Sequence, residues 1–519
     1  MTDASESFRQ HEILLTGANG FLGKVILGFF LDRFPEFKHL HILVRPRGGA
    51  PARERFDSEV LTSPSLAEIV AKRGRRFLDE KVTIHAGDIG DPGCGLPDDT
   101  IESLRGRIGL VINCAGLVEF FPPIDDSFKS NVDGVENVVA LAKNLGAKLL
   151  HVSTCYVCGA ADGLIEETDP VLGFYPRRKD PDDTSFNFRD EIAYCRERIR
   201  QMYEAAGLDP AQGARVRTKE LAQRLIDFGT QRASHWGWVN IYTYAKSIGE
   251  QILAAEEGLE YAIVRPAIVE AALEFPFPGW VEGGRTAAPL VLMAMGGLRH
   301  WTVRGDIPLE VVPVDQVAAS VLIVSALLLD GKARHVYQLG TADVNPLLME
   351  PLVRLLHQQS RRVQREERRK ARKLGMPRLP GGVRIISVAA AQERRIRLQR
   401  RLDRAQRMLS ATRRMLKRAG LPGENALATA GMLVRALGLQ AVVREQTLAL
   451  YQPFILDNRF IFESENIRAA RAMLSERDRK LLPWTPERIQ WREYWIHHEI
   501  AGIRKWVEPE AFKHWNFQI

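Results

Sequence analysis

The sequence predicts an α/β protein: a Rossmann-type doubly wound parallel sheet with a helical insertion, followed by a mainly α-helical C-terminal domain. Three observations support this. Short apolar runs alternate with amphipathic helical stretches along the first 345 residues. A glycine-rich turn follows the first run, and after about residue 345 the alternation gives way to Arg-rich helical stretches. Parallel strands covered on both faces read as nearly continuous apolar runs, so the alternation indicates a parallel sheet.

The elements are expected in a regular order along the chain. Apolar runs predict six strands, at His11–Leu15, His39–Arg45, Val82–Asp88, Leu110–Ala115, Lys148–Ser153 and Tyr261–Arg265. Helical periodicity predicts helices between or after them, at Phe21–Phe30, Asn131–Leu145 and Tyr244–Glu256. This order is typical of a sheet with helices on both faces.

Residues 160–238 separate the fifth strand from the next helix, which is long for a connection inside a compact domain. Two stretches in this insertion, Arg189–Ala206 and Thr218–Phe228, have helical periodicity. Long connections usually carry structure of their own, so a helical lid or substrate cap is expected. The predicted domains are therefore residues 1–345, which hold the sheet and the insertion, and residues 346–519, which are helical.

Composition excludes several protein classes. The 519 residues are 45% hydrophobic and 26% charged, which is ordinary for a globular protein and unlike a disordered, collagen-like or disulfide-rich chain. Five cysteines are too few for a disulfide framework, and the polar, acidic N-terminus does not resemble a signal peptide. The longest charge-free apolar stretch noted, Gln316–Leu329, is shorter than the roughly 20 residues that span a bilayer. We expect a cytoplasmic protein that is not integral to a membrane, although it could lie against one as a peripheral protein.

Positive charge is concentrated in one block. The chain has a net charge of +8, but Arg354–Arg418 holds 22 Lys and Arg against 4 Asp and Glu, a local +18, which leaves −10 for the rest. A solvated helix face, contact with anionic lipid, and capture of another anionic partner all remain open for this block. No nucleic-acid-binding module is recognised, so nucleic acid is not expected as a partner.

No metal site is predicted. Cys155 and Cys158 form a single CxxC without a second pair at zinc spacing. The sequence His497-His498-Glu499 lacks the spacing of a metal-binding helix and a companion pair.

The first strand leads into a glycine-rich turn that predicts a dinucleotide site. The run Thr16-Gly17-Ala18-Asn19-Gly20-Phe21-Leu22-Gly23 has the GxxGxxG pattern between a strand and a helix. Glycines let the backbone turn sharply and approach a pyrophosphate, whose charge is then stabilised by the helix N-terminus. All the residues of this run except Ala18 are predicted to contact the cofactor.

The end of the second strand indicates which dinucleotide binds. An NAD site uses an acid there to bind the ribose 2′-hydroxyl, whereas this strand ends in Arg45 and Arg47, with no acid before Glu54. A guanidinium suits a 2′-phosphate, so NADPH is favoured over NADH. Asp88 and Ile89 after the third strand are expected to meet the adenine. After the fourth strand, Asn113, Ala115 and Gly116 are expected to line the cofactor cleft.

Tyr242 and Lys246 are the predicted catalytic pair. They are four residues apart and therefore lie on one face of a helix. A nearby cation is expected to lower the pKa of the phenol, which can then exchange a proton with a carbonyl oxygen, and the lysine can also hold the nicotinamide ribose. A hydroxyl at the end of the fifth strand should complete the group by bonding the substrate carbonyl: Thr154 is favoured, with Ser153 as the alternative.

These motifs resemble a known family. The glycine turn, the Asn131-Val-Asp-Gly134 helix start and the Tyr242/Lys246 helix look like an extended short-chain dehydrogenase/reductase. Further segments resemble alcohol-forming fatty acyl-CoA reductases, including the family's C-terminal domain: Asn240–Lys246, Val264–Val269, Phe275–Trp280, Gln452–Phe462 and Trp491–Trp495. The Arg-rich block departs from that family's pattern. With such a substrate in view, capture of CoA phosphates or of an acidic acyl carrier protein is a further open interpretation of the block.

The resemblance implies a reaction. An enzyme of this kind would use two NADPH to reduce a long-chain fatty acyl-CoA, through a hemithioacetal and a fatty aldehyde, to a primary alcohol with release of CoA. It also implies the roles of Tyr242, Lys246 and Thr154, and contacts to the cofactor from Asn131, Pro266 and Ile268. Pro276–Trp280 and Ala287–Leu298 offer apolar side chains for a tunnel or for ordinary packing.

Three alternatives stay open at this stage. A thioester reductase would stop at the aldehyde, and an epimerase or hydroxysteroid dehydrogenase would use the same scaffold on another substrate. A non-catalytic NADP-binding regulator or membrane scaffold would not need the Tyr242/Lys246 pair.

Overall fold

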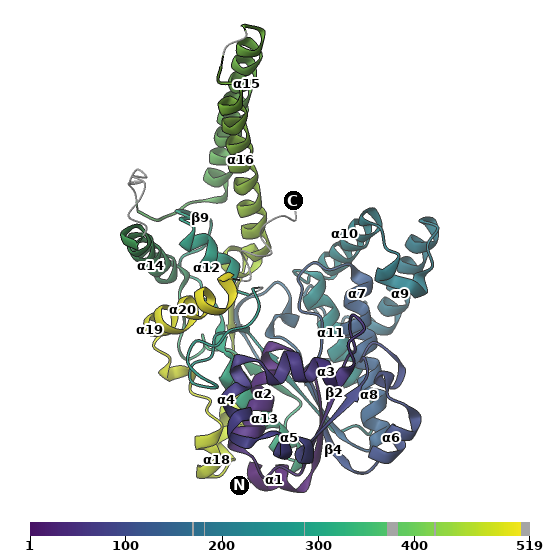
Figure 1. Ribbon diagram of the computed structural model, residues 1–519. Coiled ribbons are helices and arrows are strands. Elements are labelled where there is room, and N and C mark those ends of the chain that lie inside the picture. The colour runs from purple at the N-terminus through teal and green to yellow at the C-terminus, as the bar shows by residue number, and fades with distance from the viewer. Residues whose placement is uncertain (169–170, 181, 285, 371–381, 420–421, 510–519) are drawn as a thin grey trace. The chain divides into compact units, whose positions relative to one another are not determined.

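A seven-stranded parallel sheet organises the first part of the chain (Figure 1). The computed structural model describes residues 1–519 apart from 169–170, 181, 285, 371–381, 420–421 and 510–519. The strand order is β11–β7–β5–β4–β1–β2–β3, and every pairing is parallel. The strands are β1 (Glu12–Thr16), β2 (His39–Val44), β3 (Val82–Ala86), β4 (Ile108–Asn113), β5 (Lys148–Val152), β7 (Tyr261–Pro266) and β11 (Val336–Leu339).

The sheet confirms the predicted fold class. All six predicted strands form, and the strand order reverses direction between β1 and β4, which is where ligands bind in doubly wound sheets. The seventh strand, β11, was not predicted because it has only four residues. It is held at the sheet edge by its pairing with β7.

Helices cover both faces of the sheet. On one face α2 (Phe21–Arg33) packs against α13 (Val314–Leu329), and on the other α8 (Gly134–Leu145) packs against α11 (Ile241–Ala254) (Figure 1). The apolar run noted at Gln316–Leu329 is accounted for by α13, which is buried along almost its whole length. Its apolar character is that of a core helix.

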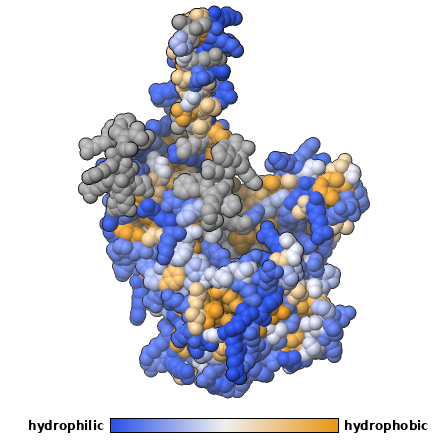
Figure 2. All heavy atoms as spheres, in the orientation of Figure 1, coloured by the Kyte–Doolittle hydropathy of each residue, from blue (hydrophilic) through white to orange (hydrophobic). Residues whose placement is uncertain are grey.

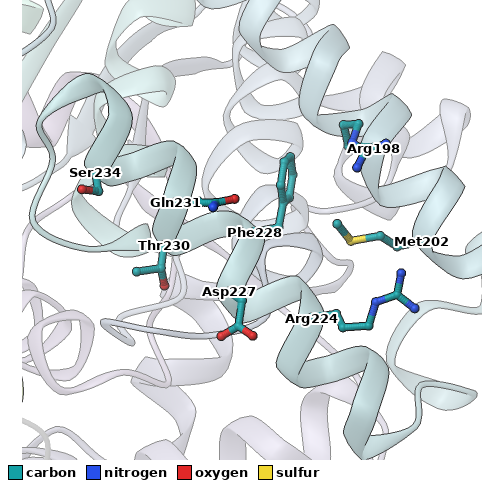
Figure 3. Close-up of a pocket in the computed structure, with 8 residues that line it drawn as sticks. All are labelled: Arg198, Met202, Arg224, Asp227, Phe228, Thr230, Gln231 and Ser234. Carbon is teal, nitrogen blue, oxygen red and sulfur yellow. The ribbon is translucent and has the colours of Figure 1, made fainter.

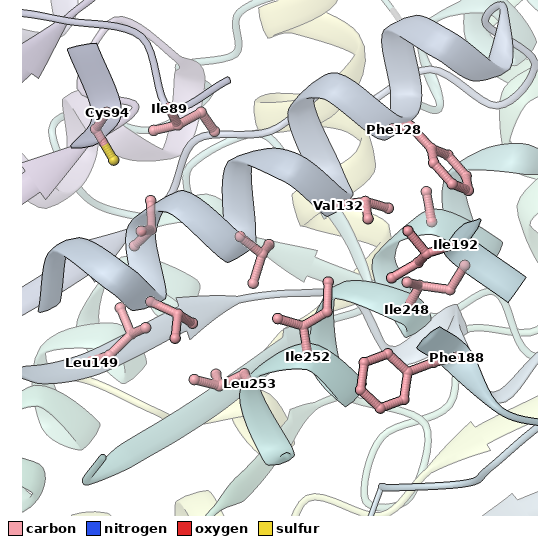
Figure 4. Close-up of a cluster of buried hydrophobic side chains, with 14 of the residues drawn as sticks. Ile89, Cys94, Phe128, Val132, Leu149, Phe188, Ile192, Ile248, Ile252 and Leu253 are labelled. Atoms are coloured by element: carbon pink, nitrogen blue, oxygen red, sulfur yellow. The ribbon is translucent and has the colours of Figure 1, made fainter. Parts of the chain in front are cut away.

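The core extends from the sheet into the insertion. Figure 4 shows Ile248 and Ile252 of α11 in one cluster with Leu149 of β5 and Ile192 of α9. The predicted insertion helices form as α9 (Phe188–Ala205) and α10 (Lys219–Trp236). Side chains cap both helices, because Asn187 accepts from the backbone at the start of α9 and Thr218 does so at the start of α10. The insertion is therefore a folded helical element packed against α11.

Shorter elements complete this part of the chain. The helices are α1 (Ala4–Gln10), α3 (Ala52–Arg55), α4 (Pro64–Arg73), α5 (Arg75–Lys81), α6 (Asp98–Leu104), α7 (Ile124–Phe128), α17 (Glu465–Ala472), α18 (Glu476–Leu481), α19 (Trp491–Glu493) and α20 (Ile500–Gly502). The short strands are β6 (Asp162–Ile165), β8 (Ile268–Glu270), β10 (Val311–Pro313) and β13 (Arg459–Phe462).

The chain divides into two compact units that differ from the predicted domains. Unit 1 comprises residues 1–286, 310–346 and 460–519, and unit 2 comprises residues 287–309 and 347–459. The predicted boundary near residue 345 falls at a unit border, but residues 460–519, which were predicted to belong to a C-terminal domain, lie in unit 1. Hydrogen bonds between residues far apart in the sequence explain why the last segment belongs to unit 1. Buried Asp478 accepts from the Ala4 amide at 2.9 Å, and Glu310 accepts from the Phe462 amide at 2.8 Å.

Unit 2 is mainly helical. Its elements are α12 (Ala288–Met295), β9 (His300–Trp301), α14 (Met349–Lys370), β12 (Arg384–Ile385), α15 (Val388–Ala419) and α16 (Glu424–Gln452). The helical stretches expected after about residue 345 are thus present, and the two longest are α15 and α16. Part of the Arg-rich block, residues 371–381, lies outside the described residues.

Candidate active site

The glycine turn forms a tight cradle between β1 and α2. Gly17 has φ +77°, and a Cβ on it would lie 2.7 Å from the Ala115 nitrogen. A Cβ on Gly23 would lie 2.1 Å from the Gly17 carbonyl oxygen, so neither position accepts a side chain. No side chain caps the first turn of α2, whose N-cap is Gly20. Its backbone N–H groups can therefore bind an anion such as a pyrophosphate.

Three predicted residues tie β1 to β4 at the point where the strand order reverses. The Thr16 hydroxyl donates to Asn113 Oδ1 at 2.7 Å and accepts from the Ala115 amide at 3.2 Å. These bonds hold the two strand ends together beneath the glycine cradle. The contacts of Thr16 and Asn113 with a cofactor remain predictions.

The end of β2 carries exposed cations, as the preference for NADPH requires. The Arg45 side chain is 57% exposed and lies 3.5 Å from the Asp88 carboxylate. The backbones of Arg47 and Ala50 form an isolated β-bridge. Arg55, which was not singled out from the sequence, donates to the Arg45 carbonyl oxygen. A third guanidinium therefore lies beside the loop that should bind the 2′-phosphate.

Arg55 is connected back to the glycine turn. Glu59 accepts from Arg55 at 2.6 Å and from Asn19 Nδ2 at 2.9 Å. The spacing of Arg55 and Glu59 by four residues on a helix is visible in the sequence, but their approach to Asn19 is a tertiary contact.

The predicted adenine residues lie at the end of β3. Asp88 Oδ1 accepts from the Gly90 amide at 3.0 Å, which shapes the turn. Ile89 is buried, and its carbonyl accepts from Asn137 Nδ2 at 2.8 Å. The structure thus places both residues at the carboxyl edge of the sheet, where the adenine of a dinucleotide would lie.

The predicted catalytic side chains come together at the ends of β5 and β7. Tyr242 and Lys246 lie one turn apart on α11, whose start is capped by Asn240. The Lys246 ammonium donates to the Val152 carbonyl at 2.9 Å. The Thr154 hydroxyl lies close enough to the Tyr242 phenol to oppose the rise that burial causes in the pKa of that phenol. The Thr154 hydroxyl also lies 3.4 Å from the carbonyl oxygen of Pro266 at the end of β7.

Two polar groups beside this trio lack a protein partner among the described residues. The hydroxyl of Ser153, the alternative to Thr154, is buried without a hydrogen bond. His151 Nε2 is likewise buried and unsatisfied, while its Nδ1 lies 3.1 Å from Asn113 Nδ2. Buried polar atoms usually have partners, so both atoms are available to bond a ligand or a water. His151 was not predicted as a site residue. The signal available in the sequence was a histidine inside the apolar run of the fifth strand.

Asn131 and Gly116 shape the loop after β4. Asn131 donates to the Leu117 carbonyl at 3.0 Å and accepts from the Leu117 amide at 3.1 Å. A Cβ on Gly116 would lie 2.8 Å from Asn131 Oδ1 and 3.1 Å from Lys246 Nζ. Asn131 therefore positions the loop beside Lys246. Ile268 lies further along the chain in β8, where its amide donates to the Glu310 carbonyl at 3.0 Å.

Burial dominates the electrostatics of the predicted catalytic pair, Tyr242 and Lys246. Burial lowers the pKa of Lys246 to about 8, with partial compensation from the Glu250 carboxylate. Burial raises the pKa of Tyr242 above its ordinary value. The expectation that Lys246 lowers the pKa of this phenol is therefore wrong for the structure described, because desolvation of the phenolate outweighs the other effects. Tyr242 is held in its protonated form, as a proton donor requires.

This arrangement predicts how reduction depends on pH. Lys246 loses its proton as the pH rises through about 8, whereas Tyr242 stays protonated over the same range. We expect kcat/KM for reduction to be independent of pH below about 8 and to decrease above it. If only Lys246 ionises, the decrease should approach about tenfold per pH unit. Steady-state rates between pH 6 and 10 measure this dependence. In the Lys246→Arg variant, any decrease in kcat/KM should occur at higher pH, because arginine keeps its charge over this range. A level profile up to pH 10 would contradict the assignment.

The two cysteines of the CxxC are structural. Cys155 Sγ donates to the Arg265 carbonyl at 2.8 Å, and burial raises the pKa of both Cys155 and Cys158. No group of three His, Cys, Asp or Glu in the described part of the chain is placed to hold a metal ion.

A separate cavity of about 560 Å³ lies in the insertion, between α9 and α10. Figure 3 shows Arg198 and Met202 of α9 across from Arg224 and Phe228 of α10. None of the predicted site residues lines this cavity.

The chain is similar to proteins of one family. The model of the male sterility protein family matches residues 15–321. The alcohol-forming fatty acyl-CoA reductase of Simmondsia chinensis is 30% identical over 357 residues, which cover 66% of this chain and 69% of that protein. The probable fatty acyl-CoA reductase 4 of Arabidopsis thaliana is 31% identical over 353 residues, which cover 66% of this chain and 68% of that protein.

Solved structures share the fold. The terminal R domain from the myxalamid PKS-NRPS biosynthetic pathway matches with a TM-score of 0.52 at 16% identity, over 98% of this chain and 92% of that domain. The reductase domain of a non-ribosomal peptide synthetase from Mycobacterium tuberculosis matches with the same TM-score at 17% identity, over 98% of this chain and 95% of that domain.

Proposed function

Because this chain belongs to the male sterility protein family of fatty acyl-CoA reductases, we propose that it reduces fatty acyl-CoA to a primary fatty alcohol with NADPH. The observation that carries the proposal is the meeting of Tyr242, Lys246 and Thr154 at the carboxyl edge of the sheet, next to the glycine cradle. Each turnover consumes one thioester, two NADPH and two protons and yields one alcohol, one CoA and two NADP+.

The residues present fit NADPH. The cradle of Gly17 and Gly23 excludes side chains where a pyrophosphate would approach, and α2 offers the N–H groups of its uncapped first turn. Arg45, Arg47 and Arg55 supply the positive charge that a 2′-phosphate needs. The cofactor supplies hydride to the carbonyl carbon, and the protein binds and orients the reactants.

The catalytic side chains have separate tasks. Tyr242 donates a proton to the carbonyl oxygen, and the hydroxyl of Thr154 donates a hydrogen bond to the same oxygen as negative charge develops on it. Lys246 places a positive charge beside the Tyr242 proton donor and holds the ribose next to the nicotinamide. A thioester and an aldehyde both present a carbonyl oxygen, so one constellation can serve both reduction steps.

The donor and the location of the enzyme are part of the proposal. We take acyl-CoA as the donor, since the curated relatives are named for it, and an acyl carrier protein as the alternative. The resemblance favours long acyl chains. A cytoplasmic location is proposed because the five cysteines are free, as expected where thiols stay reduced.

Counting the cofactor tests the proposed reaction. Purified protein is supplied with acyl-CoAs of 8 to 20 carbons and NADPH, and NADPH oxidation is compared with CoA release. We expect two NADPH per CoA and a fatty alcohol product. One NADPH per CoA with accumulating aldehyde would indicate a thioester reductase, and a separate assay with aldehyde as substrate checks this. Absence of turnover with any acyl thioester would refute the proposal.

A further inference from the structure

The helices α15 and α16 of unit 2 expose an unusual combination of apolar and cationic side chains. Within the described residues, one helical stretch is long and apolar enough to cross a membrane: Asn425–Asp457, which contains most of α16. Its most apolar 18 residues have a mean hydropathy of 1.6, and only 6% of them are buried. Arg435 interrupts this stretch, so it contains no long charge-free run in the sequence.

Helix α15 carries the charge. Between Val388 and Ala419 it has 11 Lys and Arg against 2 Asp and Glu, and none of its described residues is buried. It therefore contains half of the 22 cations in the Arg-rich block.

The two helices form an antiparallel hairpin. Arg395 forms an ion pair with Glu445 at 2.7 Å, and Leu402 lies beside Gly438. The partner number falls as the α15 number rises, which defines opposite directions, and Figure 1 shows the helices side by side. The basic helix and the apolar helix thus present one joint surface.

This surface is apolar as well as basic. More than half of the exposed large apolar side chains in the described part of the chain lie on these two helices, and Figure 2 shows apolar residues between hydrophilic ones along them. They are Val388, Ile396, Leu398, Met408, Met415, Met432, Leu433, Val442, Val443 and Leu450. An exposed apolar patch of this kind indicates a surface that binds something.

Charge decides between the possible partners. A second copy of the hairpin would cover the apolar side chains, but it would bring another +9 from α15 beside the first. An acidic protein would neutralise the arginines and would not by itself account for ten exposed apolar side chains. An anionic bilayer satisfies both features, since its phosphates meet the cations and its acyl chains meet the apolar residues.

We propose that the α15–α16 hairpin is a membrane-docking element that lies in the interface of an anionic bilayer. The 11 cations of α15 oppose insertion across the hydrocarbon core, so the hairpin lies along the surface and does not span it. The C-terminal end of α16 stays anchored in unit 2, where Tyr451, Phe454 and Ile455 are buried.

Vesicle binding by the full chain, without substrate, tests this independently of catalysis. Vesicles of phosphatidylcholine alone are compared with vesicles containing 30 mol% phosphatidylglycerol, by flotation at low and high salt. We expect binding to the anionic vesicles that weakens with salt. Each cation removed near an anionic surface weakens binding by roughly fivefold, so Arg400→Gln/Arg401→Gln/Arg404→Gln should lose more than tenfold.

Apolar variants separate the lipid from other partners. Leu433→Glu/Val443→Glu should abolish vesicle binding, whereas Leu164→Glu, which changes an equally exposed apolar residue in β6, should leave it intact. All variants should keep the circular dichroism and NADPH affinity of the unaltered protein. Failure of the unaltered protein to bind anionic vesicles would overturn the proposal. So would a dimer in vesicle-free solution that Leu433→Glu/Val443→Glu converts to monomer, because the hairpin would then bind a second copy.

Discussion

Replacing Tyr242 with Phe should lower kcat by about 10²- to 10⁴-fold while leaving NADPH affinity unchanged within about twofold. The substitution removes the hydroxyl, which is the only group of the side chain that can donate a proton. It keeps the aromatic ring of this α11 residue and therefore its packing. Thr154 and Lys246 remain in place, so the site should still bind its ligands. NADPH binding is measured by fluorescence titration, and turnover by NADPH oxidation with acyl-CoA.

The chain contains a matched control two residues away. Tyr244 is on the same helix, but its hydroxyl donates to Glu191 and lies 3.4 Å from Cys195 Sγ, toward the insertion. Tyr244→Phe makes the same chemical change away from the catalytic group, and Glu191 keeps its pairing with Arg232. We expect near-normal turnover for this variant. Equal loss of activity in both variants would mean that helix packing, and not proton donation, explains the effect of Tyr242→Phe.

The parts of the fold that follow local patterns were predictable. Six strands and both insertion helices were expected from apolar runs and helical spacing, because those signals lie within a few consecutive residues. The place of residues 460–519 in unit 1 was not predictable in this way. It depends on contacts such as that of Asp478 with the Ala4 amide, which join residues 474 positions apart.

The candidate site shows the same division. Tyr242 and Lys246 were found from their spacing on one helix, and the glycine turn from its position between a strand and a helix. Arg55 and His151 were missed because each matters only through neighbours that the fold supplies, the Arg45 carbonyl for one and Asn113 for the other. The direction of the Tyr242 pKa was also wrong, since burial cannot be read from the spacing of two residues.

Replacing Glu250 with Ala should destabilise unit 1 by about 3–5 kcal/mol, because it leaves the buried Arg265 guanidinium without its partner. Glu250 on α11 and Arg265 on β7 are both almost fully buried, and Arg265 Nε donates to Glu250 at 2.9 Å. The midpoint of chemical unfolding, followed by tryptophan fluorescence, measures the loss.

Two variants provide the comparison. Glu80→Ala removes one partner of an exposed pair with Arg76, where both side chains are mostly in water, and should shift the unfolding midpoint far less than Glu250→Ala. Glu250→Met/Arg265→Met removes both buried charges together and should be much closer to the unaltered protein than Glu250→Ala. If Glu250→Ala and Glu80→Ala shift the unfolding midpoint equally, the buried pair contributes no more than a surface pair.

The same substitution should alter catalysis through Lys246. Glu250 lies one turn beyond Lys246 on α11, and its carboxylate raises the pKa of that lysine, opposing the effect of burial. Its removal should therefore lower the pKa of Lys246 below about 8 and move the fall in kcat/KM to lower pH. A variant that only unfolds would lose activity at all pH values without moving the profile. A shift to lower pH in the folded fraction would show that the ion pair between α11 and β7 also sets the charge of the catalytic lysine.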